Sequence, residues 1–170
     1  MDHQIFFAIN GLAGKIHFLD SFGIAMAQIL IFVFIGLVVG VWWFKDRSLK
    51  RNLWIAFLSA LVSRVFIVEV IKRIVDRPRP FEVILSVHKL LVDEGSGKSF
   101  PSGHAVIFFS IAFAFWSTKW FWPLFTLAVI GSVARIFVGV HYPSDVLIGA
   151  LIGAGTSLLL LSLFKKRILS

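Results

Sequence analysis

Residues 21–44 read SFGIAMAQILIFVFIGLVVGVWWF, an apolar stretch without a single charged side chain. At about 1.5 Å per residue, a helix of this length reaches across the roughly 30 Å hydrocarbon core of a bilayer. A signal peptide would have a shorter apolar core, of about 7–15 residues, nearer the start of the chain. The stretch therefore predicts a transmembrane helix.

The composition of the whole chain agrees with a membrane protein. Hydrophobic residues make up 58% and charged residues 15%, against about 45–50% and roughly 25% in soluble domains. There is no cysteine, which excludes disulfides and thiolate metal sites. The net charge of +8 lies at the ends of apolar runs, so it favours a membrane surface over nucleic acid as partner. No linker or repeat divides the chain, and we predict one domain over residues 1–170.

Further apolar segments extend the prediction from one span to five. Before the first span, Ile5, Ile9 and Leu12 recur at helical spacing, which is typical of a helix lying in the membrane interface. We therefore expect an all-α integral membrane bundle of five transmembrane helices with an N-terminal interfacial helix. The second and third spans are predicted at residues 52–75 and 105–118. Lys119 and Pro123 mark a reversal into the fourth, which runs to about residue 140, and the fifth begins near Pro143 and runs to residue 164.

Five spans also determine which segments share a side of the membrane. The end of the second helix, the start of the third and the turn between the fourth and fifth meet on one side. Both sides carry eight basic residues, but three on this side are assigned to a site below, leaving five. The positive-inside rule then places the other side in the cytoplasm and the site on the extracytoplasmic face. The basic residues of the cytoplasmic side are Lys45, Arg47, Lys50, Arg51, Lys119, Lys165, Lys166 and Arg167.

Three polar clusters fall on the predicted outer side: KRIVDRPRP at 72–80, PSGH at 101–104 and RIFVGVHYPSD at 135–145. Phosphoryl transfer requires cations that neutralise charge on the equatorial oxygens of the phosphoryl group. Arginine offers phosphate a bidentate fork, and lysine offers a compact point charge. The three cations suited to this task are Lys72, Arg79 and Arg135.

The same clusters contain an anion cradle and acid–base groups. Ser102 and Gly103 begin a helix, where backbone N–H groups and the helix dipole bind anions. Asp145 follows His141 by four residues, so its carboxylate can hold one imidazole nitrogen protonated and leave the other to attack phosphorus. His104 then remains to protonate the leaving group.

The pattern K-x6-RP, PSGH and R-x5-H-x3-D over residues 72–145 resembles the three signature motifs of the type-2 phosphatidic acid phosphatase superfamily, which also contains vanadium haloperoxidases. The resemblance implies a lipid phosphatase that uses no metal and no cofactor. It implies a phosphohistidine on His141, oriented by Asp145, with His104 as general acid. It further implies that phosphate is bound by Lys72, Arg79, Ser102, Gly103 and Arg135.

Within the superfamily, the chain looks most like bacterial undecaprenyl-diphosphate phosphatases. The short length, IFFAINGLAGK at 5–15 and VGVHYPSDVLIGA at 138–150 carry this likeness. We therefore expect undecaprenyl diphosphate as substrate. Many of those enzymes have aspartate at the position of Gly103, and some lack Lys72. These departures leave phosphatidylglycerophosphate, phosphatidate and lipid A phosphate open as substrates.

Rival hypotheses come from other classes of protein. The same cations would serve a non-catalytic binder of anionic lipids, and the superfamily also permits vanadate-dependent oxidation. Two charges outside the motifs carry structural predictions. Glu69 is expected to pair with Lys72 and Arg73, three and four residues later. Arg64 lies deeper in the same helix, where a charge needs a partner inside the bundle or a role below the site.

Overall fold

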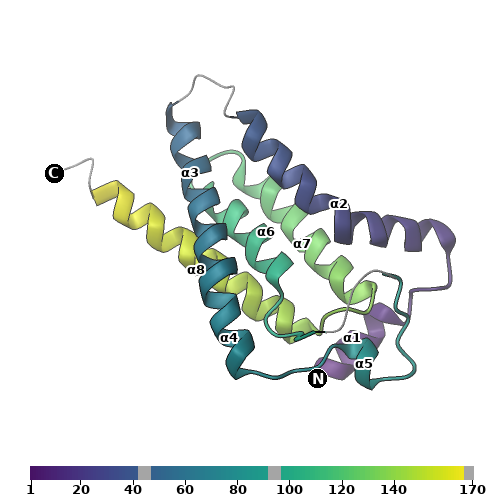
Figure 1. Ribbon diagram of the computed structural model, residues 1–170. Coiled ribbons are helices and arrows are strands. Elements are labelled where there is room, and N and C mark those ends of the chain that lie inside the picture. The colour runs from purple at the N-terminus through teal and green to yellow at the C-terminus, as the bar shows by residue number, and fades with distance from the viewer. Residues whose placement is uncertain (42–46, 92–96, 167–170) are drawn as a thin grey trace.

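The computed structural model describes residues 1–41, 47–91 and 97–166. Every regular element within these ranges is helical, which confirms the predicted all-α class (Figure 1). Three residues used in the predictions lie outside the described residues. They are Phe44, at the end of the first predicted span, and Lys45 and Arg167, on the predicted cytoplasmic side. The elements in chain order are α1 (Asp2–Asn10), α2 (His17–Val41), α3 (Arg47–Leu61), the π-helix η1 (Val62–Ile67), α4 (Val68–Ile74), α5 (Pro80–Val83), α6 (Gly103–Ala114), α7 (Phe121–Phe137) and α8 (Pro143–Lys166).

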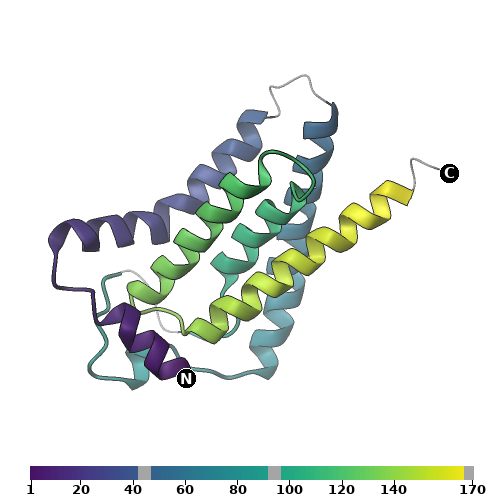
Figure 2. The same cartoon turned by 180° about the vertical axis from the view of Figure 1, so that it is seen from behind.

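The long helices surround α6, which contacts α3, α7 and α8. The elements α3, η1 and α4 run on as one helix, and α8 crosses the bundle diagonally (Figures 1 and 2). Among the described residues, two helices are long and apolar enough to cross a membrane, Ser48–Ile74 and Pro143–Phe164. The helices α6 and α7 are also apolar but shorter.

The outer surface of the bundle is apolar. Phe32 on α2, Phe66 on η1, Trp122 on α7 and Leu159 on α8 are each more than half exposed. Soluble monomers rarely expose contiguous apolar patches larger than a few hundred Å². Exposed aromatic and aliphatic side chains on four elements therefore fit helices surrounded by lipid, as expected of an integral membrane protein.

Close packing of α6 against α8 aligns the starts of these two helices. Gly149 and Gly153 lie one turn apart on α8, and a Cβ atom at either would collide with the backbone of α6. One turn later, the Ser157 hydroxyl donates to the Ser110 carbonyl (2.6 Å) and lies within hydrogen-bond distance of Ser59 Oγ (2.7 Å). Small residues at this spacing let helix backbones approach closely in membranes. This stripe of Gly149, Gly153 and Ser157 holds α8 against α3 and α6.

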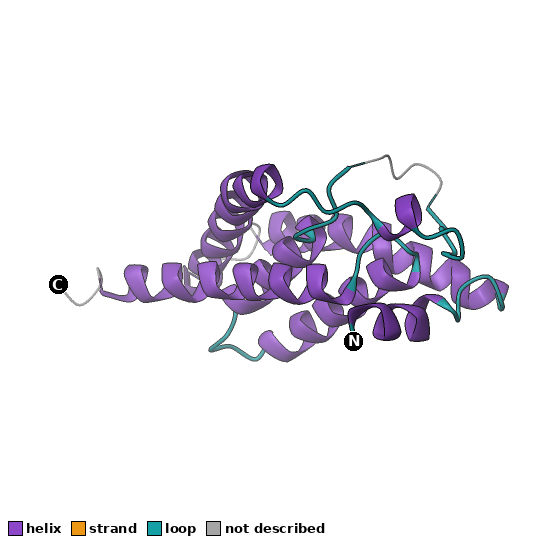
Figure 3. Ribbon diagram, turned by 90° about the horizontal axis from the view of Figure 1, so that it is seen from below, coloured by secondary structure: helices purple, strands orange, loops and turns teal. Residues whose placement is uncertain are grey.

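The N-terminal helix α1 is anchored at the end of the bundle that carries the site. The buried Asn10 donates to the carbonyls of His88 (2.9 Å) and Phe137 (2.8 Å) and accepts the His88 N–H (3.0 Å). Phe6, one turn earlier, is fully buried. Ile5 and Leu12 of the predicted interfacial face remain exposed. Figure 3 views the molecule from this end and shows α1 and the loops lying across it.

Three local predictions need correction. The long helix begins at Arg47, earlier than the predicted residue 52. The helix predicted at 105–118 spans Gly103–Ala114, because Ser102 accepts the Ala105 N–H as its N-cap. The prediction for Glu69 was wrong, since its ion pair is with Arg64, at 2.6 Å. A π-helix forms i→i+5 hydrogen bonds, and this wider turn brings residues five apart onto one face.

Candidate active site

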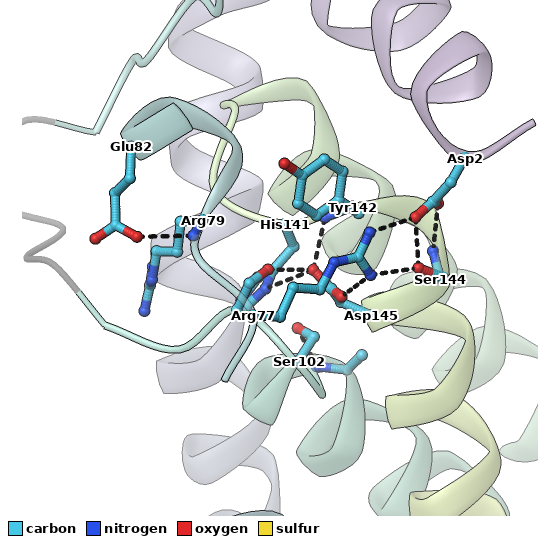
Figure 4. Close-up of polar contacts among 11 residues, drawn as sticks. Asp2, Arg77, Arg79, Glu82, Ser102, His141, Tyr142, Ser144 and Asp145 are labelled. Carbon is cyan, nitrogen blue, oxygen red and sulfur yellow. Dashed lines mark hydrogen bonds and ion pairs between the residues drawn. The ribbon is translucent and has the colours of Figure 1, made fainter. Parts of the chain in front are cut away.

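The three motifs meet at one end of the bundle, at the termini of five helices. Lys72 lies in the last turn of α4 and Arg79 is the N-cap of α5. Arg135 lies in the last turn of α7, and Asp145 lies in the first turn of α8. His141 occupies the short connection between these two helices. Residues separated by more than 70 positions thus face one region (Figures 1 and 4).

The start of α6 is joined directly to the start of α8. The Ser102 N–H donates to the Asp145 carbonyl (3.0 Å), and the Ser102 hydroxyl caps the helix. The N-terminal N–H groups of an α-helix have no intrahelical acceptors and lie at the positive end of the dipole. Gly103 and His104 begin this helix. The arrangement therefore presents an anion cradle beside the His141 connection.

His141 and Asp145 face each other across the turn into α8. His141 Nδ1 lies 3.7 Å from Asp145 Oδ2, which is longer than a hydrogen bond, and both side chains are buried. The same carboxylate oxygen accepts the Tyr142 N–H (2.8 Å) and the Ser99 hydroxyl. Nδ1 has no hydrogen-bond partner among the described residues. Asp145 nevertheless acts on this imidazole, since its charge favours the protonated form of His141.

The environment of His141 keeps its imidazole neutral. Burial lowers the pKa of His141 from 6.5 to about 4, and the charges of Arg135 and Arg79 act in the same direction. Asp145 opposes both effects without cancelling them. The neutral imidazole is the form of histidine that can act as a nucleophile.

The three predicted cations lie at the same end of the bundle as His141, and two of them act on its imidazole. Arg135 is buried, and its Nη1 donates to the Ala27 carbonyl (3.4 Å). Arg79 lies near enough to both His141 and Lys72 to interact with them electrostatically. The Lys72 ammonium is partly buried and also interacts with Asp145. Arg135 and Arg79 therefore act on the His141 imidazole, whereas Lys72 acts on its neighbours Arg79 and Asp145.

Arg77 is a site residue that the sequence analysis did not identify. Its Nη1 lies 2.6 Å from Asp145 Oδ1 and also donates to Ser144 Oγ (2.6 Å). Its Nη2 lies 2.6 Å from Asp2 Oδ2, and the guanidinium stacks 4.0 Å from the ring centre of Tyr142. Figure 4 shows Arg77 lying between the two carboxylates. Arg77 thereby joins α1, the loop after α4 and the start of α8.

The carboxylate of Asp2 completes this network. It accepts the N–H and the hydroxyl of Ser144, at 2.9 and 2.6 Å. Burial raises the pKa of Asp2, but hydrogen bonds from Ser144 and Arg77 outweigh this effect and hold the pKa below its ordinary value. The N-terminal helix therefore supports the site through a charged contact.

Comparison with known proteins identifies the family. The PAP2 superfamily matches residues 53–169, which include all three motifs. This chain belongs to the PAP2 superfamily. The resemblance predicted from the motifs is thus confirmed, and the chain is a phosphatase of this family.

Individual relatives of this PAP2 phosphatase cover most of its length. The undecaprenyl-diphosphatase BcrC of Bacillus subtilis is 33% identical over 156 residues, 91% of this chain and 79% of the relative. LpxE from Aquifex aeolicus has a similar structure, with a TM-score of 0.78 and 27% identity over 95% of this chain and 94% of that one. A transmembrane PAP2 phosphatidylglycerolphosphate phosphatase from Bacillus subtilis shares the fold, with a TM-score of 0.64 and 21% identity over 98% and 87% of the two chains.

The structure brings together most of the PAP2 motif residues, and it adds others. Ser99, Arg77 and Asp2 contact the Asp145 carboxylate or its ion-pair partner. The sequence does not single these residues out. Arg77, for example, stands two positions before Arg79 in DRPRP, and nothing in that segment shows which arginine contacts Asp145. Among the described residues, no three His, Cys, Asp or Glu side chains are grouped to hold a metal.

Proposed function

We propose that this PAP2 phosphatase hydrolyses undecaprenyl diphosphate to undecaprenyl phosphate and inorganic phosphate. The observation that carries the proposal is the buried neutral imidazole of His141, set between the Asp145 carboxylate and the charges of Arg135 and Arg79. Similarity to BcrC over 91% of the chain supports the choice of lipid. The apolar outer surface suits a substrate whose polyprenyl tail stays in the bilayer.

The proposed reaction has two steps. His141 Nε2 attacks the terminal phosphorus, the bond to the bridging oxygen breaks, and His104 gives that oxygen a proton. Water then loses a proton to His104 and displaces the phosphoryl group from His141, so inorganic phosphate leaves and both histidines are restored. No metal ion or cofactor takes part. The phosphate oxygens are bound by Lys72, Arg79, Ser102, Gly103 and Arg135.

The proposal includes a position in the membrane. Five spans are formed by α2, the continuous α3–α4 helix, α6, α7 and α8, and α1 lies in the interface. Exposed Ile5 on α1 and Leu12 in the turn after it support the interfacial position. The basic residues opposite the site favour a cytoplasmic location for that side. The site then opens on the extracytoplasmic face, where a lipid headgroup reaches it from the bilayer surface.

A phosphate monoester of another lipid is the second candidate substrate. The motifs bind phosphate and do not read the lipid tail, so phosphatidylglycerophosphate, phosphatidate and lipid A phosphate fit the same residues. Gly103 favours this alternative, because many undecaprenyl-diphosphate phosphatases have aspartate at that position. A non-catalytic lipid binder is the candidate from another class, and it predicts binding without phosphate release.

Phosphate release from purified protein tests these proposals. We expect release from undecaprenyl diphosphate to exceed that from phosphatidylglycerophosphate, phosphatidate and lipid A, and to persist in EDTA. His141→Ala should abolish release on every substrate, whereas His17→Ala, at an exposed histidine that begins α2, should not. Acid-labile label on His141 from terminally labelled substrate would mark the phosphohistidine. Release that survives in His141→Ala, or that EDTA abolishes, contradicts the mechanism.

A further inference from the structure

Arg64 is a charged residue inside the continuous α3–α4 helix and outside the three motifs. It lies in the π-helix η1, and such turns occur often at functional sites. Its Nη1 bonds Glu69 Oε1 at 2.6 Å. The wide turn thus directs Arg64 along the helix toward the end that carries Lys72 and the site.

The guanidinium of Arg64 rests on the start of α6. A Cβ atom at Gly103 would lie 2.7 Å from Arg64 Nε and 3.4 Å from its Cζ. Arg64 therefore occupies the space that a side chain at position 103 would fill. It also interacts electrostatically with Lys72. A fourth cation thus borders the anion cradle, in addition to the three that the motifs supply.

Arg64 retains the capacity to bind an anion while it is paired with Glu69. A guanidinium has five N–H donors, and within the described residues Arg64 makes one side-chain hydrogen bond, through Nη1 to Glu69. Its side chain is 38% exposed, so the protein does not enclose it. Charged groups within membrane spans face the bundle interior or a water-filled cavity, because lipid disfavours them. The contact with Gly103 places the Arg64 guanidinium beside the start of α6.

A diphosphate substrate gives this cation a ligand. The motif residues serve the phosphate that is transferred to His141, but a diphosphate also brings a second charged phosphate that stays with the lipid. That phosphate is the leaving group, and it must lie near His104, the residue after Gly103. We propose that Arg64 binds this second phosphate and so makes the site prefer a lipid diphosphate over a monophosphate. The inference rests on the proposed function, whose substrate class it explains.

Two substrates with the same tail test the inference. Farnesyl diphosphate and farnesyl phosphate, in detergent micelles, differ only in the second phosphate. Arg64→Gln should lower kcat/KM for the diphosphate about 10- to 100-fold, the loss typical of a hydrogen bond between charged groups. The loss on the monophosphate should be much smaller. Glu69→Gln is the matched control, because it breaks the ion pair but keeps the guanidinium, and it should preserve the diphosphate preference.

The outcomes separate this inference from the function on which it rests. Equal losses on both substrates in Arg64→Gln, or a matching loss of preference in Glu69→Gln, would overturn the role of Arg64 and leave the hydrolysis intact. No phosphate release from the diphosphate by the unmodified protein would overturn both proposals. If Arg64→Gln yields no folded protein by size-exclusion chromatography, Arg64→Met carries the test. It removes the charge but keeps an unbranched side chain, and an unchanged preference would overturn the inference.

Discussion

Replacing Arg77 with leucine should separate the positioning of the catalytic carboxylate from phosphate binding. Asp145 is fully buried, and Arg77 is its ion-pair partner at 2.6 Å. Removing one partner of a buried pair costs about 3–5 kcal/mol. Asp145 keeps its bonds from Tyr142 and Ser99, and Arg77 is 26% exposed, so we expect a loss of about 2–3 kcal/mol in the free energy of unfolding.

The expected readouts follow from that loss. At about 2–4 °C per kcal/mol for a chain of this size, the thermal midpoint should fall by about 4–12 °C. A displaced carboxylate misorients His141, and a shift of about 1 Å costs on the order of 100-fold in rate. Because Arg77 is not proposed to touch phosphate, kcat should fall while KM changes little.

Two matched variants test this prediction, with kcat and KM measured separately for each. Asp2→Asn keeps the Arg77–Asp145 pair and should lower the thermal midpoint with little effect on kcat. Lys72→Met removes a proposed phosphate ligand and should raise KM. The reasoning is refuted if Arg77→Leu raises KM at constant kcat, because Arg77 would then bind the substrate.

Three further predictions concern His141, the packing of α8 and the anchoring of α1. Because the pKa of His141 is lowered to about 4, the neutral form persists well below pH 6.5. The acid limb of kcat/KM, corrected for substrate ionisation, should lie near that value, and a limb near 6.5 would contradict the burial argument. Gly153→Ala should lower the free energy of unfolding by about 1–3 kcal/mol through overpacking against α6, measured by thermal melting in detergent, whereas Gly155→Ala, which meets no atom within 4 Å, should not. Asn10→Ala leaves the buried Phe137 carbonyl and the partly buried backbone groups of His88 without this partner and should cost about 1–3 kcal/mol in the same assay, while Gln4→Ala at an exposed position should be neutral.

Several contacts of the site were predictable because they form between residues that are close together in the sequence. Pro143 begins α8, so an aspartate two residues later lies in the first turn and faces the histidine that precedes the helix. Ser102 caps α6 for an equally local reason, since its hydroxyl accepts an N–H three residues ahead. Such contacts depend on spacing within a single turn, and spacing is visible in the sequence.

Partner choice among charged residues was not predictable, as Glu69 shows. Spacing favoured Lys72 and Arg73 as its partners, but the π-turn directs it to Arg64. Arg77 shows the same limit over a longer distance. Its carboxylate partners lie 75 and 68 positions away, on α1 and α8. Neither partner follows from the segment in which Arg77 stands.

The amino-acid sequence by itself determined the apolar helices, the start of α8 at Pro143 and the three motifs, because these depend on composition and on spacing within one or two turns. Only the tertiary structure decided that Arg77 holds Asp145, that Arg64 rests on Gly103, and that Phe6 and Asn10 form the buried face of α1. These contacts join segments far apart in the chain. They depend on how glycine stripes and buried polar groups bring whole helices into register, which no local pattern specifies.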